Sequence, residues 1–468
     1  MALPQLGLGL SSNAQTTDVP RPFALLDAHP GLFDFIEYSA PLDVNAARRE
    51  ASLFPELEKR RATTPMLYHP VHLNLAGPEL ESPERLALLA EHVSAVGSPW
   101  VSNDVGWWHH QGVPFPGYLY VTPRLDAEGL ANAVAHVRHV RDAMPVPLLI
   151  ENPVVMTARG GMHVVEFMSR LHEATGCPLL IDVGHLVSHQ LARGLPLLEG
   201  IGALPFAQVA QLHVAGGVVN GKFYADDHPQ PIRDETWALF DELNQRASSL
   251  CAVTYEGDGH PEPVARRVLS QLRSKLRERQ PLVAQRGDGR AETPSASEWW
   301  PYFHSIHSEP TEELRFRLAV LAEQLDREVP FARAAVAPTL TQLAPFVASE
   351  HFEAHFTHTR PLADTFLTWA AREARTKPGA DALVSLELWA RTTCARKKFA
   401  EPFEATFPVD LTEALHAAGS LRRHLRARES TSIDAWEGLL HCARRAVPGP
   451  WKVRLTPTAS GIRIEAIQ

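Results

Sequence analysis

The stretch from Leu179 to His189, Leu-Leu-Ile-Asp-Val-Gly-His-Leu-Val-Ser-His, most constrains how this chain can fold. The apolar run 178–181 has the length and composition of a buried parallel strand. It ends in Asp182, and His185 follows three residues later. A carboxylate and an imidazole at the end of a buried strand are costly unless they are paired, hydrogen-bonded or metal-bound. Because the chain repeats this arrangement, we expect a functional site built from strand ends.

The length and charge distribution indicate two domains of different character. At 468 residues the chain is too long for one ordinary core, and 45% hydrophobic with 21% charged residues is typical of a soluble globular protein. The whole net charge of −9 lies in residues 1–283, which also hold 15 of the 23 histidines, whereas residues 284–468 carry equal numbers of acidic and basic side chains. An acidic, histidine-rich domain favours cations and disfavours a nucleic-acid partner.

The cysteines and the apolar runs predict the cellular compartment. The 4 cysteines form no CxxC pair, which favours reduced thiols in a cytoplasmic protein. No apolar run approaches the length of a membrane span, and the N-terminus lacks the basic region of a signal peptide. We therefore expect a cytoplasmic protein with no membrane partner.

Residues 1–283 alternate strand-like and helix-like segments. Eight strands with intervening helices predict a (β/α)8 barrel of the TIM type, which is an α/β fold. An open doubly wound sheet is the alternative. The expected helices are Glu84–Val96, Ala127–Ala143, Val164–Thr175, Asp234–Arg246 and Pro263–Arg277, with a loop over Asn13–Pro22 after the first strand. The expected strands are Leu6–Leu10, Phe33–Tyr38, Met66–Leu75, Trp100–Asn103, Pro147–Glu151, Pro178–Asp182, Val209–Val214 and Cys251–Glu256.

The remaining residues predict a linker and a second domain. Residues 284–297 are polar and contain the Gly, Ser and Pro typical of linkers. Residues 298–468 predict a mainly α-helical domain, and the alternation over Trp451–Glu465 predicts a terminal β-hairpin. The expected helices of this domain are Glu312–Glu328, Ala363–Ala374, Ala382–Phe399 and Ile433–Ala446.

Seven of the eight expected barrel strands carry or lead into histidine or carboxylate side chains. The C-terminal strand ends of (β/α)8 enzymes form the active-site face, so these groups should meet at one mouth. As bare anions they would repel one another, whereas a cation resolves the repulsion, and mixed His and carboxylate ligands suit iron, manganese or zinc. The candidate residues are Glu37, His69, Asp104, Glu151, Asp182, His185, His213, Asp226, His228, Glu256 and Asp258.

Other histidines are given simpler interpretations. The two-residue period of a strand leaves open whether His72 points toward the mouth or away from it. His109 and His110 are interpreted as loop residues that line the mouth. A lone histidine such as His163 or His260 is interpreted as a surface or capping residue.

Short motifs follow the order of the expected strands, and together they resemble one known family. The motifs include Leu67-Tyr-His69, Leu149-Ile-Glu-Asn-Pro153, Leu180-Ile-Asp-Val-Gly-His185, Leu212-His-Val-Ala-Gly216, Asp226-Asp-His-Pro-Gln-Pro-Ile232 and Thr254-Tyr-Glu-Gly-Asp258. They resemble S-L-H, L-L-E-N-P, L-L-D-V-N-N, I-H-L-A-G, D-x-H-x-x-P-V and L-I-E-W-D of the multinuclear non-heme iron-dependent oxidases, the group that contains the methanobactin biosynthesis oxidase. The resemblance spans the whole predicted barrel.

The resemblance implies two or three irons per chain, in mixed Fe(II)/Fe(III) states, with O2 as co-substrate. Glu37 and Asp258 are interpreted as catalytic side chains. The implied ligand sets are His69, Asp104 and Glu151 for one iron, Glu151, Asp182, His213 and Glu256 for a second, and His185, Asp226 and His228 for a third.

This chain departs from the family at two positions. The family usually has E-H where this chain has Asn103-Asp104, so a carboxylate replaces a histidine ligand. The second Asn of the family's N-N is His185 here. Both replacements can bind metal, and they would change the redox tuning of the site.

The resemblance also implies a peptide substrate. Segments 342–352 and 382–391 are similar to the partner proteins that present the peptide to these oxidases, so residues 298–468 are interpreted as a peptide- or leader-binding domain. A separate partner protein is expected unless this domain replaces it. We therefore expect an iron- and O2-dependent oxidase that modifies a ribosomally synthesised precursor peptide at cysteine. The alternatives are a divalent-metal isomerase or phosphodiesterase on a xylose isomerase-like barrel and a metal-stabilised peptide-binding protein.

Overall fold

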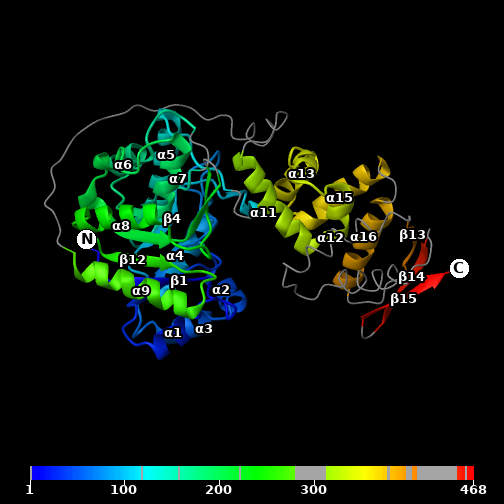
Figure 1. The fold of residues 1–468 in the computed structure, drawn as a ribbon, viewed down its shortest axis with the longest axis horizontal. Coiled ribbons are helices and arrows are strands. Elements are labelled where there is room, and N and C mark those ends of the chain that lie inside the picture. The colour runs from blue at the N-terminus through cyan, green and yellow to red at the C-terminus, as the bar shows by residue number, and fades with distance from the viewer. Residues whose placement is uncertain are drawn as a thin grey trace. The chain divides into compact units, whose positions relative to one another are not determined.

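The computed structural model divides the chain into two compact units (Figure 1). The first comprises Met1–His109 and Tyr120–Ser297, and the second comprises His110–Leu119 and Glu298–Gln468. No pattern in the sequence separated 110–119 from the barrel. The predicted linker over 284–297 lies outside the described residues. The structure describes residues 3–116, 120–155, 159–220, 223–279, 312–376, 380–396, 403–407, 451–458 and 461–467.

The first unit is built around a closed barrel of eight parallel strands, in the order β1-β12-β9-β8-β7-β4-β3-β2. All eight predicted strands are present, so the (β/α)8 prediction is confirmed and the open doubly wound alternative is wrong. The strands are β1 (Gly7–Ser12), β2 (Phe35–Tyr38), β3 (Met66–Tyr68), β4 (Val101–Asp104), β7 (Leu148–Glu151), β8 (Leu179–Asp182), β9 (Val209–Ala215) and β12 (Ala252–Glu256).

Strand β3 is much shorter than predicted. The apolar pattern favoured a strand over Met66–Leu75, but β3 ends at Tyr68. Pro70 has no N–H with which to continue the ladder, and His72 adopts a left-handed φ of 67°. The strand therefore stops early and leaves His69 directly beyond its end.

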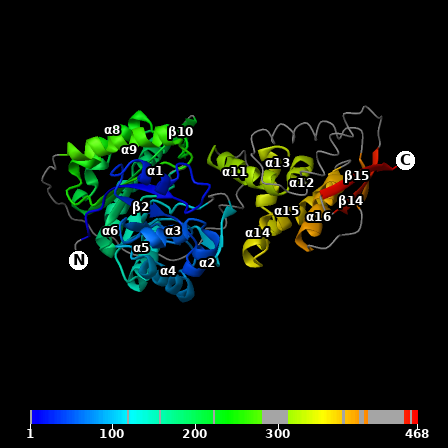
Figure 2. The same ribbon diagram turned by 90° about the horizontal axis from the view of Figure 1, so that it is seen from below.

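A helix follows every barrel strand, and Figure 2 shows α4, α5 and α6 side by side outside the barrel. Ser82 and Asp126 cap the starts of α4 and α5 with side-chain oxygens, and Gly97 ends α4 in the left-handed conformation. The predicted helices are present to within one residue. The helices are α1 (Pro22–Ala28), α2 (Val44–Glu50), α3 (Phe54–Arg60), α4 (Pro83–Val96), α5 (Ala127–Ala143), α6 (Val164–Thr175), α7 (Val183–Arg193), α8 (Asp234–Arg246) and α9 (Glu262–Arg277).

The inner face of the barrel changes from apolar to polar along the strands. Phe35, Leu67, Trp100, Leu149 and Leu180 belong to one buried hydrophobic cluster, which we call the apolar floor. Residues two positions further along a strand point to the same face. In the same order, those residues are Glu37, His69, Ser102, Glu151 and Asp182. The floor thus closes the barrel beneath a mouth lined with ionisable groups.

Two short antiparallel pairs lie beyond the strand ends. β10 (Gly217–Asn220) follows β9 and pairs with β11 (Phe223–Asp226), with Gly217 opposite Asp226. The sequence pattern did not predict this hairpin. Because Gly217 follows β9 closely, the pairing places Asp226 near the end of β9. The other pair is β5 (His109–His110) with β6 (Val113–Pro114), after β4.

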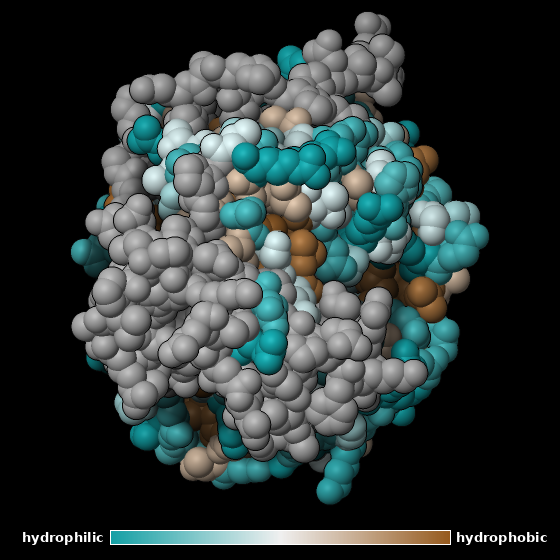
Figure 3. Space-filling view, turned by 90° about the vertical axis from the view of Figure 1, so that its right-hand side faces the viewer, coloured by the Kyte–Doolittle hydropathy of each residue, from teal (hydrophilic) through white to brown (hydrophobic). Residues whose placement is uncertain are grey.

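The second unit is mainly helical, as predicted, and ends in the predicted hairpin of β14 and β15, to which β13 adds a third antiparallel strand. The predicted helix over Ile433–Ala446 lies outside the described residues. On the face in Figure 3, hydrophilic side chains cover much of the described surface. None of the described helices is long and apolar enough to cross a membrane. The elements are α11 (Glu312–Glu328), α12 (Pro330–Val336), α13 (Leu340–Val347), α14 (Glu350–Thr357), α15 (Leu362–Glu373), α16 (Ala380–Arg396), β13 (Phe403–Phe407), β14 (Trp451–Thr458) and β15 (Gly461–Ile467).

The contact between Gly9 and the apolar floor gives a test of the barrel packing. Gly9 pairs with Phe35 across β1 and β2, and a Cβ added at Gly9 would lie 2.2 Å from the Phe35 ring. Gly9→Ala should therefore lower the free energy of unfolding by about 1–3 kcal/mol, measured by urea denaturation. Gly161→Ala is the control, because nothing lies within 4 Å of a Cβ added there. Equal stability of the two variants would contradict the packing described.

Candidate metal centre

The barrel mouth brings all eleven candidate residues into one connected cluster, in which each lies within 4.0 Å of at least one other. Glu37, Asp104, Glu151, Asp182, His213 and Glu256 stand on barrel strands β2, β4, β7, β8, β9 and β12. The other five are His69 just beyond β3, His185 in the first turn of α7, Asp226 at the end of β11, His228 in the loop after β11 and Asp258 in the loop after β12. Seven are buried, whereas Asp226, His228, Glu256 and Asp258 are partly exposed.

The deepest part of the cluster surrounds Glu151. Its Oε2 atom lies 3.7 Å from Nε2 of His69, which in turn lies 3.9 Å from Oδ2 of Asp104. The other carboxylate oxygen, Oε1, lies 3.3 Å from Nδ1 of His213. One oxygen of Glu151 thus faces His69 and the other faces His213. This placement allows Glu151 to bridge two cations.

Two further groups lie beside Glu151. Nδ1 of His213 is also 3.3 Å from Oε1 of Glu256, and one ligand atom each from Asp182, His213 and Glu256 lie within 4.8 Å of one another. Nearer the opening, Oδ2 of Asp226 lies 3.4 Å from Nε2 of His185 and 3.2 Å from Nε2 of His228. The cluster therefore offers more than one set of His and carboxylate atoms with the spacing of a metal site.

Strand and helix termini fix the carboxylate of Asp182. Asp182 ends β8 and is also the N-cap of α7, where its Oδ1 accepts a hydrogen bond of 2.7 Å from the backbone N–H of His185. The Asn152 side chain pairs with the backbone N–H and C=O of Asp182 at 2.9 and 3.0 Å. With Oδ1 occupied by the cap, Oδ2 of Asp182 remains as the ligand atom.

Each of the four histidines has one ring nitrogen hydrogen-bonded to a protein group and the other directed at the carboxylates. In metal sites, such a bond fixes the tautomer and the ring orientation of the ligand. The bonds are His69 Nδ1 to Ser102 Oγ at 2.9 Å, His185 Nδ1 to Asn152 O at 2.8 Å, His228 Nδ1 to Asp258 Oδ2 at 3.2 Å and His213 Nε2 to Glu37 Oε1 at 2.7 Å. All four rings are thus arranged as metal ligands are.

Five buried atoms of the cluster make no hydrogen bond to any described residue. Buried polar atoms are nearly always satisfied, so five in one place require an explanation. The atoms are Asp104 Oδ1, Glu151 Oε2, Asp182 Oδ2, His213 Nδ1 and Asp226 Oδ1. Carboxylate oxygens and imidazole nitrogens that face one another without hydrogen bonds are the donor set of iron, manganese or zinc. The residues therefore fit bound metal.

Several histidines lie outside this cluster, among them His72, His109 and His163. His109 is bound through Nε2 to Oε1 of Glu81 at 2.7 Å. His72 has its backbone carbonyl bound by Arg85. His163 caps α6 through its side chain, as expected for a capping residue.

Comparison with known proteins identifies the family. Residues 7–277 match the family model of the RiPP precursor modification enzymes MbnB/TglH/ChrH, that is, enzymes that modify ribosomally synthesised peptide precursors. The chain belongs to this family. A UPF0276 protein of Caulobacter vibrioides is 27% identical over 51% of this chain and 84% of its own length, and one of Streptomyces avermitilis is 31% identical over 42% of each chain.

Comparison with solved structures finds matches that cover more than half of this chain. A xylose isomerase domain containing protein of Salmonella typhimurium matches with a TM-score of 0.41 and 11% identity, over 59% of this chain and 99% of its own. Endonuclease IV of Thermus thermophilus matches with a TM-score of 0.37 and 18% identity, over 59% of this chain and 100% of its own.

Burial and the neighbouring histidines shift the pKa values of the acidic groups in this RiPP-family site in opposite directions. Burial, reinforced by the charge of Asp104, holds the pKa of Glu151 well above its usual range. Burial is also the main cause that raises the pKa of Asp182 to about 7. At Glu256 burial is outweighed by His213 and His228, which lower its pKa to about 2. Without a cation, the site must therefore hold protons between its carboxylates.

The supporting residues were not evident from the sequence. Asn152, which follows the ligand position Glu151, carries no signal of its own beyond the L-L-E-N-P motif. Ser102 and Gln211 each stand two residues before a candidate, Asp104 and His213. The two-residue period of a strand places them on the same inner face, and this pattern was the signal that could have found them.

The raised pKa values predict how the metal-free protein responds to pH. Asp182, with a pKa of about 7, and His213, whose pKa is raised by Glu37 and other carboxylates against the effect of burial, hold protons that the unfolded chain would release. The stability that these protons provide is lost as pH rises through the folded pKa values. Chelator-treated protein should therefore unfold at a lower temperature at pH 8 than at pH 6.

Anaerobic Fe(II) should remove this difference, because the cation takes the place of the protons. Calorimetry at both pH values, with and without Fe(II), makes the measurement. A metal-free protein that is at least as stable at pH 8 as at pH 6 would show that the cluster needs no cation.

Proposed function

We propose that this chain is an iron- and O2-dependent oxidase that modifies a ribosomally synthesised peptide at cysteine. The single observation that carries the proposal is the cluster of His and carboxylate groups at the mouth of a barrel in a family of precursor-modifying enzymes. Its unbonded atoms give room for more than one ion, and its mixed ligands suit a redox-active metal.

The structure supports a specific assignment of ligands. Glu151 would hold two irons, because its two oxygens face different histidines. The three sets are His69, Asp104 and Glu151, then Glu151, Asp182, His213 and Glu256, and finally His185, Asp226 and His228. Bound Fe(II) supplies the electrons with which O2 is activated.

The protein groups around the cluster orient the site and keep water away from it. Trp108 and Tyr120 stack with ring centroids 4.1 Å apart and form a small apolar cluster with Val154. Burial raises the pKa of Tyr120 well above its usual range, and the nearby charge of Asp104 adds to this effect. The buried Tyr120 ring, stacked on Trp108, would help to keep water from the Asp104 side of the site, where a reactive oxidant needs protection from solvent. Asp258 holds the ring of His228 from the opposite edge.

The family match favours the oxidase over the alternative of a divalent-metal isomerase or phosphodiesterase. A lysine or a basic clamp for phosphate beside the metal would instead favour one of those reactions. Among the described residues, every ion pair made by a cluster member joins a histidine and a carboxylate of the cluster itself.

We further propose that the second unit binds the precursor peptide, since the family match ends at residue 277 and leaves the helices α11 to α16 without a role in the metal site.

Asp182→Asn gives a direct test of the oxidase. The amide oxygen of Asn can still cap α7, so the fold should survive, whereas the anionic ligand is lost. Anaerobically reconstituted parent protein should contain more than one iron per chain. It should consume O2 with a cysteine-containing precursor peptide encoded beside its gene, but not with the Cys→Ser peptide. In Asp182→Asn, turnover should fall more than roughly 100-fold, beyond the usual effect of a residue that only supports a ligand.

The matched control is Asp142→Asn, on the exposed end of α5, which should keep full turnover. Less than one iron per chain after reconstitution, or undiminished turnover of Asp182→Asn, would contradict the proposal. Product mass from the parent enzyme identifies the oxidation, because each two-electron loss removes two hydrogens or adds one oxygen.

A further inference from the structure

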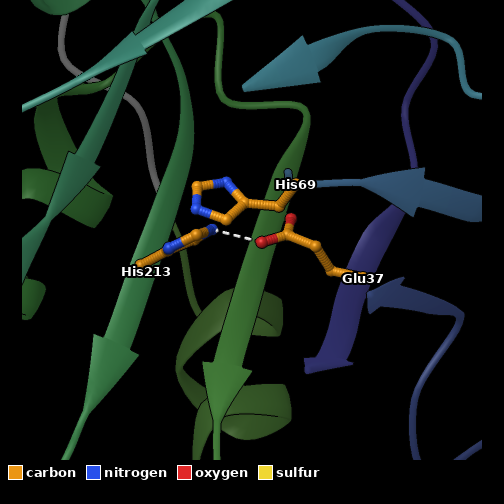
Figure 4. Close-up of side chains that lie close together, drawn as sticks. All are labelled: Glu37, His69 and His213. Atoms are coloured by element: carbon orange, nitrogen blue, oxygen red, sulfur yellow. Dashed lines mark ion pairs between the residues drawn. The ribbon is translucent and has the colours of Figure 1, made fainter. Parts of the chain in front are cut away.

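The hydrogen bonds of Glu37 differ from those of four other carboxylates in the cluster. Glu37 is 2% exposed, and both of its oxygens are already hydrogen-bonded. Figure 4 shows the ion pair between Glu37 and His213, in which Oε1 lies 2.7 Å from Nε2. Its Oε2 accepts hydrogen bonds from the Gln211 amide and from Oγ1 of Thr254, the latter at 3.1 Å. By contrast, the carboxylates Asp104, Glu151, Asp182 and Asp226 each keep one unbonded oxygen.

The partners of Glu37 are fixed in turn by the apolar floor. Gln211 is fully buried, and its Oε1 accepts a 2.8 Å hydrogen bond from Nε1 of Trp100. An indole N–H can only donate, so the oxygen of the Gln211 amide must face Trp100 and its NH2 must face Glu37. The two amide hydrogens then go to Glu37 and to Thr254 Oγ1, the latter at 3.0 Å. None remains for the Nε2 atom of His213, 3.2 Å away.

This hydrogen-bond pattern determines which nitrogen of His213 carries a proton. Oε2 of Glu37 accepts hydrogen bonds from both Gln211 and Thr254, an arrangement that favours the carboxylate form, so the hydrogen between Glu37 Oε1 and His213 Nε2 is assigned to His213. The lone pair of Nδ1 then faces Glu151 and Glu256, each at 3.3 Å. A lone pair that faces two carboxylates is favourable when a cation lies between them.

We propose that Glu37 is a positioning residue, which acts with Gln211 and Trp100 to present Nδ1 of His213 to a metal ion. This assignment differs from the prediction that Glu37 is catalytic. It rests on the metal binding of the proposed function, and it is independent of iron, O2 and peptide. The chain of contacts connects the apolar floor to the ligand shell, so the core of the barrel sets the orientation of a metal ligand.

The competing assignment makes Glu37 itself a metal ligand. Glu37, His69 and His213 have ligand atoms within 4.8 Å of one another, which would suffice for an ion. An ion there would take Glu37 Oε1 away from the Nε2 proton of His213 and would leave Nδ1 of His213 unbonded. The two assignments therefore predict different results when the carboxylate and the amide exchange places.

Exchange variants of the full-length protein test the positioning role. In Glu37→Gln, two amides meet, and the new NH2 group either opposes Gln211 or turns to His213 and moves the ring proton to Nδ1. Co²⁺ affinity should then fall roughly 10–100-fold. In the double variant Glu37→Gln/Gln211→Glu, the amide at position 37 would donate to the new carboxylate at position 211 and accept from His213, and Trp100 would keep its acceptor. Co²⁺ affinity should return to within a few-fold of the parent.

The readouts are Co²⁺ affinity, the number of Co²⁺ ions per chain and the visible Co²⁺ spectrum, measured anaerobically. Glu81→Gln is the matched control, since Glu81 is also a buried carboxylate bound to a histidine but lies outside the cluster, and it should not change Co²⁺ affinity. Unchanged ion number with rescue in the double variant supports the positioning role. Loss of one ion without rescue shows that Glu37 is a ligand and overturns the proposal.

A purely structural role would also overturn it. In that case the variants would lower the thermal midpoint of the metal-free protein and leave Co²⁺ affinity unchanged. Because O2 and peptide take no part in these measurements, failure of the exchange would leave the proposed oxidase standing. Conversely, a successful exchange in a protein without oxidase activity would overturn only the proposed function.

Discussion

The structure depends on the cost of burying several carboxylates that face one another. Glu151 and Asp182 are almost entirely buried, and burial raises their pKa values by more than the nearby histidines lower them. The barrel can carry these groups because its strands switch from apolar to polar side chains within two residues, above a floor that is already packed. The packing of the apolar floor thus holds the strand ends in place although the carboxylates that they carry repel one another.

Orientation in the mouth comes from groups that do not themselves face the carboxylates. Ser102, the Asn152 carbonyl, Asp258 and Glu37 each bind the outer nitrogen of one histidine, so all four rings present the other nitrogen inward. Ser102, Asn152 and Glu37 stand on strands or directly beside them, so the barrel sets the ring positions of three histidines, whereas His228 and Asp258 lie in loops. This explains how a site with so few hydrogen bonds among its ligands can have a defined geometry.

The sequence predicted the barrel well because each strand is an apolar run with a helix after it, and Met66–Leu75 was overextended only because Pro70 and the left-handed His72 interrupt an apolar pattern. The acidic and histidine candidates could be found because their polarity is anomalous at a buried strand end. The strand period places Gln211 and Ser102 on the inner face, but it does not reveal what they bind, since their partners Trp100 and His69 lie more than 30 residues away. The hairpin that returns Asp226 was missed because β10 and β11 are too short to show a period.

The most direct test of the central claim is an anomalous difference map at the iron edge, from crystals of anaerobically reconstituted protein. We expect at least two peaks in the barrel mouth, one between His69 and Glu151 and one bound by Nδ1 of His213 together with Glu256, with Glu37 outside the coordination of both. A single peak, or a peak bound by Glu37, would contradict this expectation.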